Sequence, residues 1–202
     1  MKKLIILWLL AISFYIGRVF ADATFELQSR LNKINNFHAN FLQKVIKADG
    51  NLIHNAEGQL WIKRPNLFNW HIVSPDENWL ISDGTNFWFY NPIVDQVTVT
   101  LLNDTTNDIP FILITRNDNK DWKRYKISQN NDNFLLTSKE NNENKKYFSI
   151  TITTDGTIKQ FSVMEQDGLI SLYELKVQQN SKFDDDKFKF VPPQGTTIDD
   201  QR

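Results

Sequence analysis

The chain has 202 residues, of which 41% are hydrophobic and 13% are aromatic, and it contains no cysteine. Its 23 lysines and arginines nearly balance its 24 aspartates and glutamates, which disfavours bulk binding of nucleic acid because such binding needs a clustered basic face. Without thiol ligands a closed zinc site is not expected, and the core alone must hold the fold.

Residues 1–21 are predicted to form a secretory signal peptide. Two lysines precede an apolar run over residues 4–16, and small residues lie before a cleavage point after Ala21. A transmembrane anchor is the alternative, but the run is shorter than the ~20 apolar residues that span a bilayer. We therefore expect a mature chain of residues 22–202 that forms a single domain.

The start of the mature chain is predicted to be an amphipathic helix. Leu27, Leu31 and Ile34 follow i, i+4, i+7 spacing, with charged residues between them. An ordinary helix that covers a core would show the same pattern.

From residue 37 onward, short runs alternate apolar and polar side chains, as β-strands do. Turn-forming pairs such as Asp-Gly and Asn-Pro separate the runs. The fold class is therefore predicted to be mainly β, an antiparallel meander that curves strongly or forms a barrel. The apolar positions of these runs are Phe68, Trp70, Ile72, Phe87, Phe89, Val97, Val99, Leu101, Phe148, Ile150, Ile152, Phe188 and Phe190.

Two segments depart from the strand pattern. Residues 108–114 are apolar on every side, with Pro110 near their start, which predicts a short buried helix. Residues 191–195 contain two prolines and a glycine, which predicts an extended tail on the surface.

Signatures of catalysis are absent from the sequence. There is no nucleophile elbow and no phosphate-binding glycine loop, and the three histidines lack the spacing of metal ligands. We therefore expect neither an enzyme nor a metal or cofactor site, although a pair of catalytic carboxylates needs no sequence spacing and stays open.

Arg64 is the most informative single residue. It shares strand parity with Leu60 and Ile62, so it points toward an apolar surface. A buried charge is costly unless it is hydrogen-bonded, so Arg64 is either a satisfied structural group or a functional one. From the base rates of residue burial, the structural role is favoured.

The stretch around Arg64 resembles a known family. Arg64-Pro65, Phe68 and Trp70 are followed by Asp83-Gly84, and then by Trp88, Tyr90, Pro92 and Gln96. This pattern is similar to that of the LolA family of outer-membrane lipoprotein carriers of Gram-negative bacteria. The resemblance extends along nearly the whole chain and is weakest over residues 130–146.

The resemblance implies a fold, a function and partners. The fold would be an unclosed antiparallel β-barrel whose open side is covered by short helices acting as a lid. The function would be that of a monomeric periplasmic chaperone, which takes lipoproteins from the inner-membrane ABC transporter LolCDE and delivers them to the outer-membrane receptor LolB. No cofactor would be needed.

Specific residues can then be assigned expected roles. Arg64 would latch the lid by donating to exposed helix carbonyls when the hollow is empty. The lid residues would be Leu27, Leu31, Ile34, Phe111, Ile112 and Ile114. The acyl-chain cavity would be lined by Leu60, Ile62, Phe68, Trp70, Phe87, Phe89, Val97, Val99, Phe148, Ile150 and Ile152, although strand parity does not distinguish a cavity wall from a filled core.

Two other classes of function remain as alternatives. A generic periplasmic barrel that binds a small apolar ligand, like a lipocalin, would show similar strands. A secreted hydrolase would need carboxylates or a triad that converge in a cleft.

Overall fold

The computed structural model describes residues 22–105, 111–139, 147–165, 167–179 and 183–202. The predicted signal peptide and the first part of the predicted helix over residues 108–114 lie outside these residues. In the part that is described, no helix is long and apolar enough to cross a membrane.

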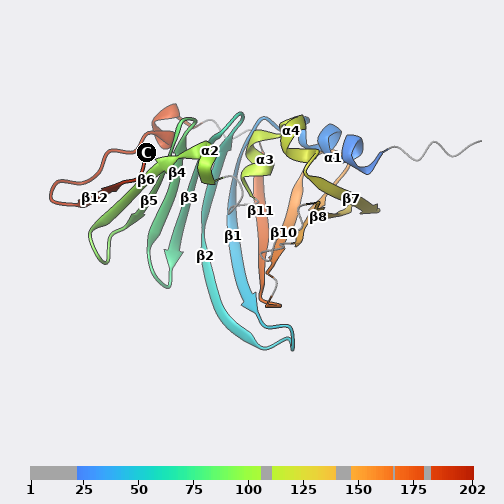
Figure 1. Ribbon diagram of the computed structural model, residues 1–202, viewed down its shortest axis with the longest axis horizontal. Helices are drawn as coiled ribbons and strands as arrows, with labels where there is room; N and C mark the ends of the chain where they lie inside the picture. Colours follow the sequence, from blue (N-terminus) through green and yellow to red (C-terminus); the bar gives the residue numbers. More distant parts are fainter. Residues whose placement is uncertain (1–21, 106–110, 140–146, 166, 180–182) are drawn as a thin grey trace, which may run out of the picture.

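One curved sheet of twelve strands forms the body of the protein, and it leaves β7 and β12 as separate edges (Figure 1). Neighbouring strands are antiparallel except for β12, which pairs with β6 in parallel. The sheet order is β12-β6-β5-β4-β3-β2-β1-β11-β10-β9-β8-β7, so the prediction of an unclosed, mainly antiparallel barrel is confirmed. The strands are β1 (Asn36–Ile46), β2 (Leu52–Lys63), β3 (Leu67–Ser74), β4 (Asn78–Asp83), β5 (Asn86–Asn91), β6 (Gln96–Leu101), β7 (Tyr125–Asn130), β8 (Asn133–Ser138), β9 (Tyr147–Ile152), β10 (Ile158–Met164), β11 (Ile170–Gln179) and β12 (Thr197–Asp200).

Short helices lie together along one end of the sheet (Figure 1). The first begins at a capping Asp22, whose carboxylate accepts from the Thr24 amide at 3.0 Å. It ends at Leu31, so Ile34 of the predicted stripe lies just beyond it. The helices are α1 (Ala23–Leu31), α2 (Leu102–Thr105), α3 (Ile112–Arg116), α4 (Asn119–Trp122) and the 3-10 helix η1 (Asp185–Phe188).

The core lies between the helices α1 to α4 and one face of the sheet, which we call the inner face. Directly opposed residues share a face, and the register aligns Ile62 with Phe68 and Leu60 with Trp70. Leu27 and Leu31 of α1 and the residues Ile112 to Ile114 of α3 complete this cluster, and all are buried. The predicted lid residues therefore pack onto the apolar face of the sheet.

Val97 and Val99 do not lie on the inner face, which corrects the prediction that they line a cavity. The register of β5 with β6 opposes Tyr90 to Val97 and Trp88 to Val99, whereas Phe87 faces Thr100. Both valines are fully buried, because the C-terminal segment covers this outer side, where Phe190 packs against Trp88 and Tyr90.

The segment before that cover also differs from its prediction. The alternation of Phe188 and Phe190 with lysines predicts a strand, but Asp185–Phe188 forms η1. Asp184 caps it by accepting from the Asp186 amide at 3.2 Å, and Phe188 is buried. The local cap and the burial of one ring outweigh the alternating pattern.

Gly58 permits the close contact of three strands. A Cβ atom at this position would lie 2.0 Å from the His71 carbonyl oxygen and 2.7 Å from Phe41 Cζ. We expect Gly58→Ala to lower the free energy of unfolding by about 3 kcal/mol, because backbone and ring would both have to move. Gln59→Ala is the control, with an expected change within about 0.5 kcal/mol. Equal urea midpoints for the two variants would contradict this account of the packing.

Candidate functional site

The inner face contains a hollow with a volume of about 270 Å³. Trp70 lies at its centre, with ring centroids 4.8 Å from Phe111 and 5.2 Å from Tyr173. Phe111, at the N-cap position of α3, lines the hollow on the side of the helices. The lining residues are Gln43, Trp70, Ile72, Leu80, Phe111, Phe161, Val163, Glu165, Ser171 and Tyr173.

The predicted cavity residues that lie on the inner face divide into three groups. Trp70 lines the hollow itself. Phe89 shares the inner face with Leu80 but is 36% exposed. The others on the inner face are buried in the core cluster around the hollow: Leu60, Ile62, Phe68, Phe87, Phe148, Ile150 and Ile152.

The sequence interpretation missed the walls that β10 and β11 supply. Phe161 and Val163 alternate with Ser162 on β10, a pattern that could have been recognised. On β11 the inward side includes Ser171 and Tyr173, which share strand parity with the buried Leu175. Their pairing with Val163 and Phe161 places them inside.

The hollow is small in this state. Binding sites for small molecules usually have volumes of about 300–1,000 Å³. The volume of this hollow, about 270 Å³, is below that range. A larger apolar ligand would enter only if Phe111 and α3 moved away from the sheet.

Arg64 joins the two helical segments that cover the inner face. Its Nε donates to the carbonyl oxygen of Ile114 in α3 at 2.7 Å. Its Nη1 donates to the carbonyl oxygens of Leu31, at the end of α1, and of Ile34, the latter at 2.5 Å. These carbonyls lie near helix ends, where intrahelical partners are lacking, so Arg64 has the geometry expected of a latch.

The electrostatics of Arg64 suit a bond that can be broken. Its described acceptors are backbone carbonyls and include no carboxylate, and its buried Nη2 has no hydrogen-bond partner among the described residues. Burial lowers the pKa of Arg64 to about 10, so the side chain stays protonated at neutral pH. Each such bond contributes about 1.5–3 kcal/mol.

Arg30, which the sequence interpretation missed, holds α1 to the sheet more firmly. Its guanidinium bonds to Glu26 at 2.7 Å, to Asp132 at 2.6 Å and to the Ile152 carbonyl at 2.7 Å, and it lies over the ring of Phe134. Glu26 lies in α1 itself, so the bonds that attach α1 to the sheet are those to Asp132 and to the Ile152 carbonyl. The bond to Asp132 joins two charged groups, and such bonds are stronger than those from a guanidinium to a carbonyl.

By contrast, α1 contacts the α3–α4 segment through neutral amide pairs. Asn117 donates to Asn32, and Gln28 donates to Asn119, each at 2.6 Å. Neutral hydrogen bonds contribute less than charged ones, so the bonds between α1 and the α3–α4 segment are weaker than those between α1 and the sheet.

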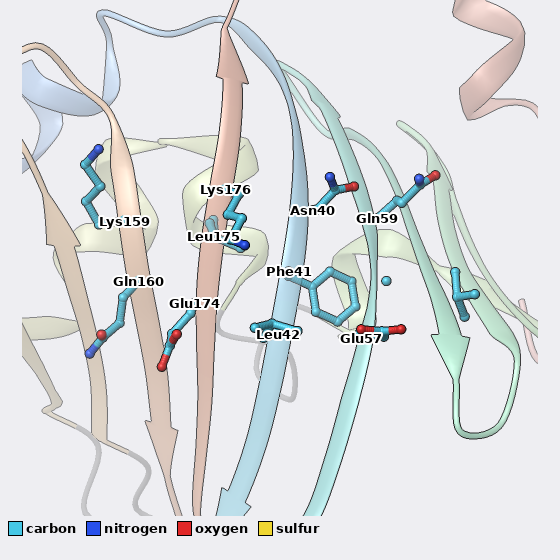
Figure 2. A pocket seen from close by; sticks show the side chains of 12 residues that line it. Asn40, Phe41, Leu42, Glu57, Gln59, Lys159, Gln160, Glu174, Leu175 and Lys176 are labelled. Carbon is cyan, nitrogen blue, oxygen red and sulfur yellow. The ribbon is translucent and has the colours of Figure 1, made fainter.

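A second, wider depression lies on the outer face of the sheet, with a volume of about 630 Å³. Figure 2 shows side chains of β10, β11, β1 and β2 spread along it, with Lys159 and Lys176 toward one end and Glu57 and Glu174 toward the other. Charged side chains lie along this depression on the outer face, so an acyl chain there would contact charged groups. Among the described residues there is also no cluster of side chains that could hold a metal ion. The inner hollow is therefore the candidate site.

Solved structures with similar folds support the architecture. A LolA superfamily protein from Nitrosomonas europaea aligns with a TM-score of 0.50 at 12% identity, covering 84% of this chain and 98% of that one. An uncharacterised conserved protein from Thermus thermophilus aligns with a TM-score of 0.52 at 9% identity, covering 89% and 99%. At such low identities the likeness concerns the fold alone.

Sequence comparisons are more specific. The family model described as outer membrane lipoprotein carrier protein LolA matches residues 32–191. An outer-membrane lipoprotein carrier protein of Pectobacterium carotovorum is 59% identical over 184 residues, 91% of each chain. A protein of the same name from Photorhabdus laumondii is 55% identical over all 202 residues, 100% of each chain. The chain therefore belongs to the LolA family of outer-membrane lipoprotein carrier proteins.

Proposed function

We propose that this protein is a periplasmic chaperone, not an enzyme, that carries lipoproteins by shielding their acyl chains in the inner hollow. The observation that carries the proposal is the apolar hollow closed by helices that Arg64 holds through backbone carbonyls. Residues 1–21 would direct export and then be removed, and the mature chain would act as a monomer. Relatives that match the full length bear the name of lipoprotein carriers.

The energetics fit a carrier whose cover opens. Keeping acyl chain from water is worth about 0.8 kcal/mol per CH₂, so a chain of ~15 methylenes gains roughly 12 kcal/mol on entering an apolar site. This exceeds the few kcal/mol that hold the latch. Cargo could thus displace the α3–α4 segment, and re-formation of the Arg64 bonds would favour release.

The partners belong to the same proposal. An inner-membrane transporter of the LolCDE type would load the carrier, and an outer-membrane receptor of the LolB type would unload it. The carrier itself would need no cofactor, since loading and unloading change only packing and hydrogen bonds. A lipocalin-like role is less favoured, because the closed hollow is small for a constitutive apolar ligand.

The decisive experiment is release of lipoprotein from spheroplasts. The protein, purified from periplasm, is incubated with energised spheroplasts that contain the transporter, and the soluble fraction is separated by size. We expect acylated lipoprotein to co-elute with the carrier. A folded protein that releases no lipoprotein, but binds free fatty acid, would instead support the lipocalin-like alternative.

A further inference from the structure

The hollow is not uniformly apolar, because one end of it carries a group of polar side chains. Gln43 of β1, Tyr173 and Ser171 of β11, and Glu165 after β10 all contribute to its lining. They lie toward the β1–β2 and β10–β11 turns, at the end of these strands away from the helices (Figure 1). Phe111 lines the opposite, apolar end, so the two ends of the hollow differ in polarity.

The hydroxyl of Tyr173 is arranged as a hydrogen-bond donor. Gln43 Nε2 donates to Tyr173 Oη at 3.1 Å. Burial raises the pKa of Tyr173 to about 12 and outweighs the hydrogen bond with Ser171, which lowers this pKa. The phenol therefore keeps its proton. With its oxygen accepting from Gln43, the phenol can donate that proton to the neighbouring Ser171 hydroxyl in the empty hollow and to a ligand carbonyl in the loaded one.

The ring of Tyr173 is held firmly in this position. It stacks on Phe161 with centroids 4.6 Å apart and an interplanar angle of 18°, and it meets Trp70 edge to face at 5.2 Å. A donor that is already fixed before the ligand arrives loses little conformational entropy on binding.

We propose that Tyr173, supported by Gln43, binds a neutral ester or amide carbonyl at the head of the acylated cargo. This inference rests on the proposed function and adds an orientation to it. The acyl chains would extend toward Phe111 and the helices, and the protein part of the cargo would leave the hollow at the end formed by the β1–β2 and β10–β11 turns.

Glu165 makes the site selective for a neutral head group. Its carboxylate lines the same end of the hollow and adds to the negative potential at Tyr173. A free fatty acid would bring its own carboxylate beside Glu165, where like charges repel strongly at reduced dielectric. An ester carries no such charge, so the geometry favours acyl esters over the free acids.

The test compares two lipopeptides that differ only in their carbonyls. One carries an S-diacylglyceryl cysteine with ester links, and the other is its dialkyl ether analogue with chains of equal length. We expect the wild-type protein to bind the ester about fivefold to tenfold more tightly, the factor expected of one hydrogen bond. Tyr173→Phe should abolish that preference and leave the affinity for the ether unchanged.

Matched variants separate the possible outcomes. Tyr90→Phe, which changes a phenol on the outer face against Phe190, should keep the ester preference. Glu165→Gln should strengthen binding of a free fatty acid and not of its methyl ester. Equal affinity of the wild type for ester and ether, or a preference that survives in Tyr173→Phe, overturns the inference. Failure of the wild type to bind either lipopeptide would instead refute the proposed function.

Discussion

Replacing Arg64 with leucine will leave a carrier that loads acylated cargo but passes it to the receptor at least tenfold more slowly. The variant loses the bonds to the carbonyls of Leu31, Ile34 and Ile114. Without them the closed, empty state is less stable, and the balance between loaded and empty carrier shifts toward the loaded state. A tenfold change needs only about 1.4 kcal/mol, less than one charged hydrogen bond.

The measurement is the rate at which a fluorescent lipoprotein moves from purified carrier to receptor-bearing vesicles. Arg64→Lys should be intermediate, because a lysine keeps the charge but lacks the planar fork that reaches several carbonyls. Arg116→Leu is the matched control: this arginine ends α3, but it bonds to Asn66, Asn103 and Asp121 rather than to α1. A normal transfer rate in Arg64→Leu would disprove the latch.

Fixing α1 to the α3–α4 segment will prevent loading altogether. Cysteines that replace Gln28 and Asn119, whose side chains are 2.6 Å apart, can be joined by a short thiol-reactive bridge. The closed hollow of about 270 Å³ then cannot widen. A chain of ~15 methylenes would forgo roughly 12 kcal/mol of burial, so release of lipoprotein from spheroplasts should fall to background.

Because the chain has no native cysteine, only the two introduced cysteines can react with the bridging reagent. The same double variant without the bridge should load normally. A bridge between cysteines at Lys44 and Glu174, which pair at 3.4 Å on the outer face, should also leave loading intact. Normal loading of the bridged Gln28–Asn119 variant would show that cargo enters without separation of these helices.

The contacts of Arg64 with a helical cover were expected only from the family resemblance. Strand alternation, turn residues and the parity of Arg64 were enough to predict the curved antiparallel sheet and an arginine directed at an apolar surface. They succeed because side-chain direction along one strand follows from backbone geometry alone. The same rule placed Leu60 and Ile62 on one face of β2, and the register aligns them with Trp70 and Phe68 of β3.

Parity fails where two strands must be compared. Phe87 and Val97 belong to neighbouring strands, and only the register of β5 with β6 puts them on opposite faces. Alternation likewise could not reveal that a C-terminal segment would bury the outer face there. Hydrophobic residues on either side of a sheet look alike in sequence when both sides are covered.

The attachments of the cover were decided only by tertiary structure. Arg30 and Asp132 are 102 positions apart, and their 2.6 Å contact exists because α1 packs beside the β7–β9 end of the sheet. The polar end of the hollow likewise arises because Gln43 and Tyr173, 130 positions apart, become partners on β1 and β11. Sequence by itself determined which residues are apolar, which way each strand turns them and that Arg64 faces inward. The pairing of distant strands depends on the packing of the whole sheet. It decided which residues line the hollow and which hold the helical cover in place.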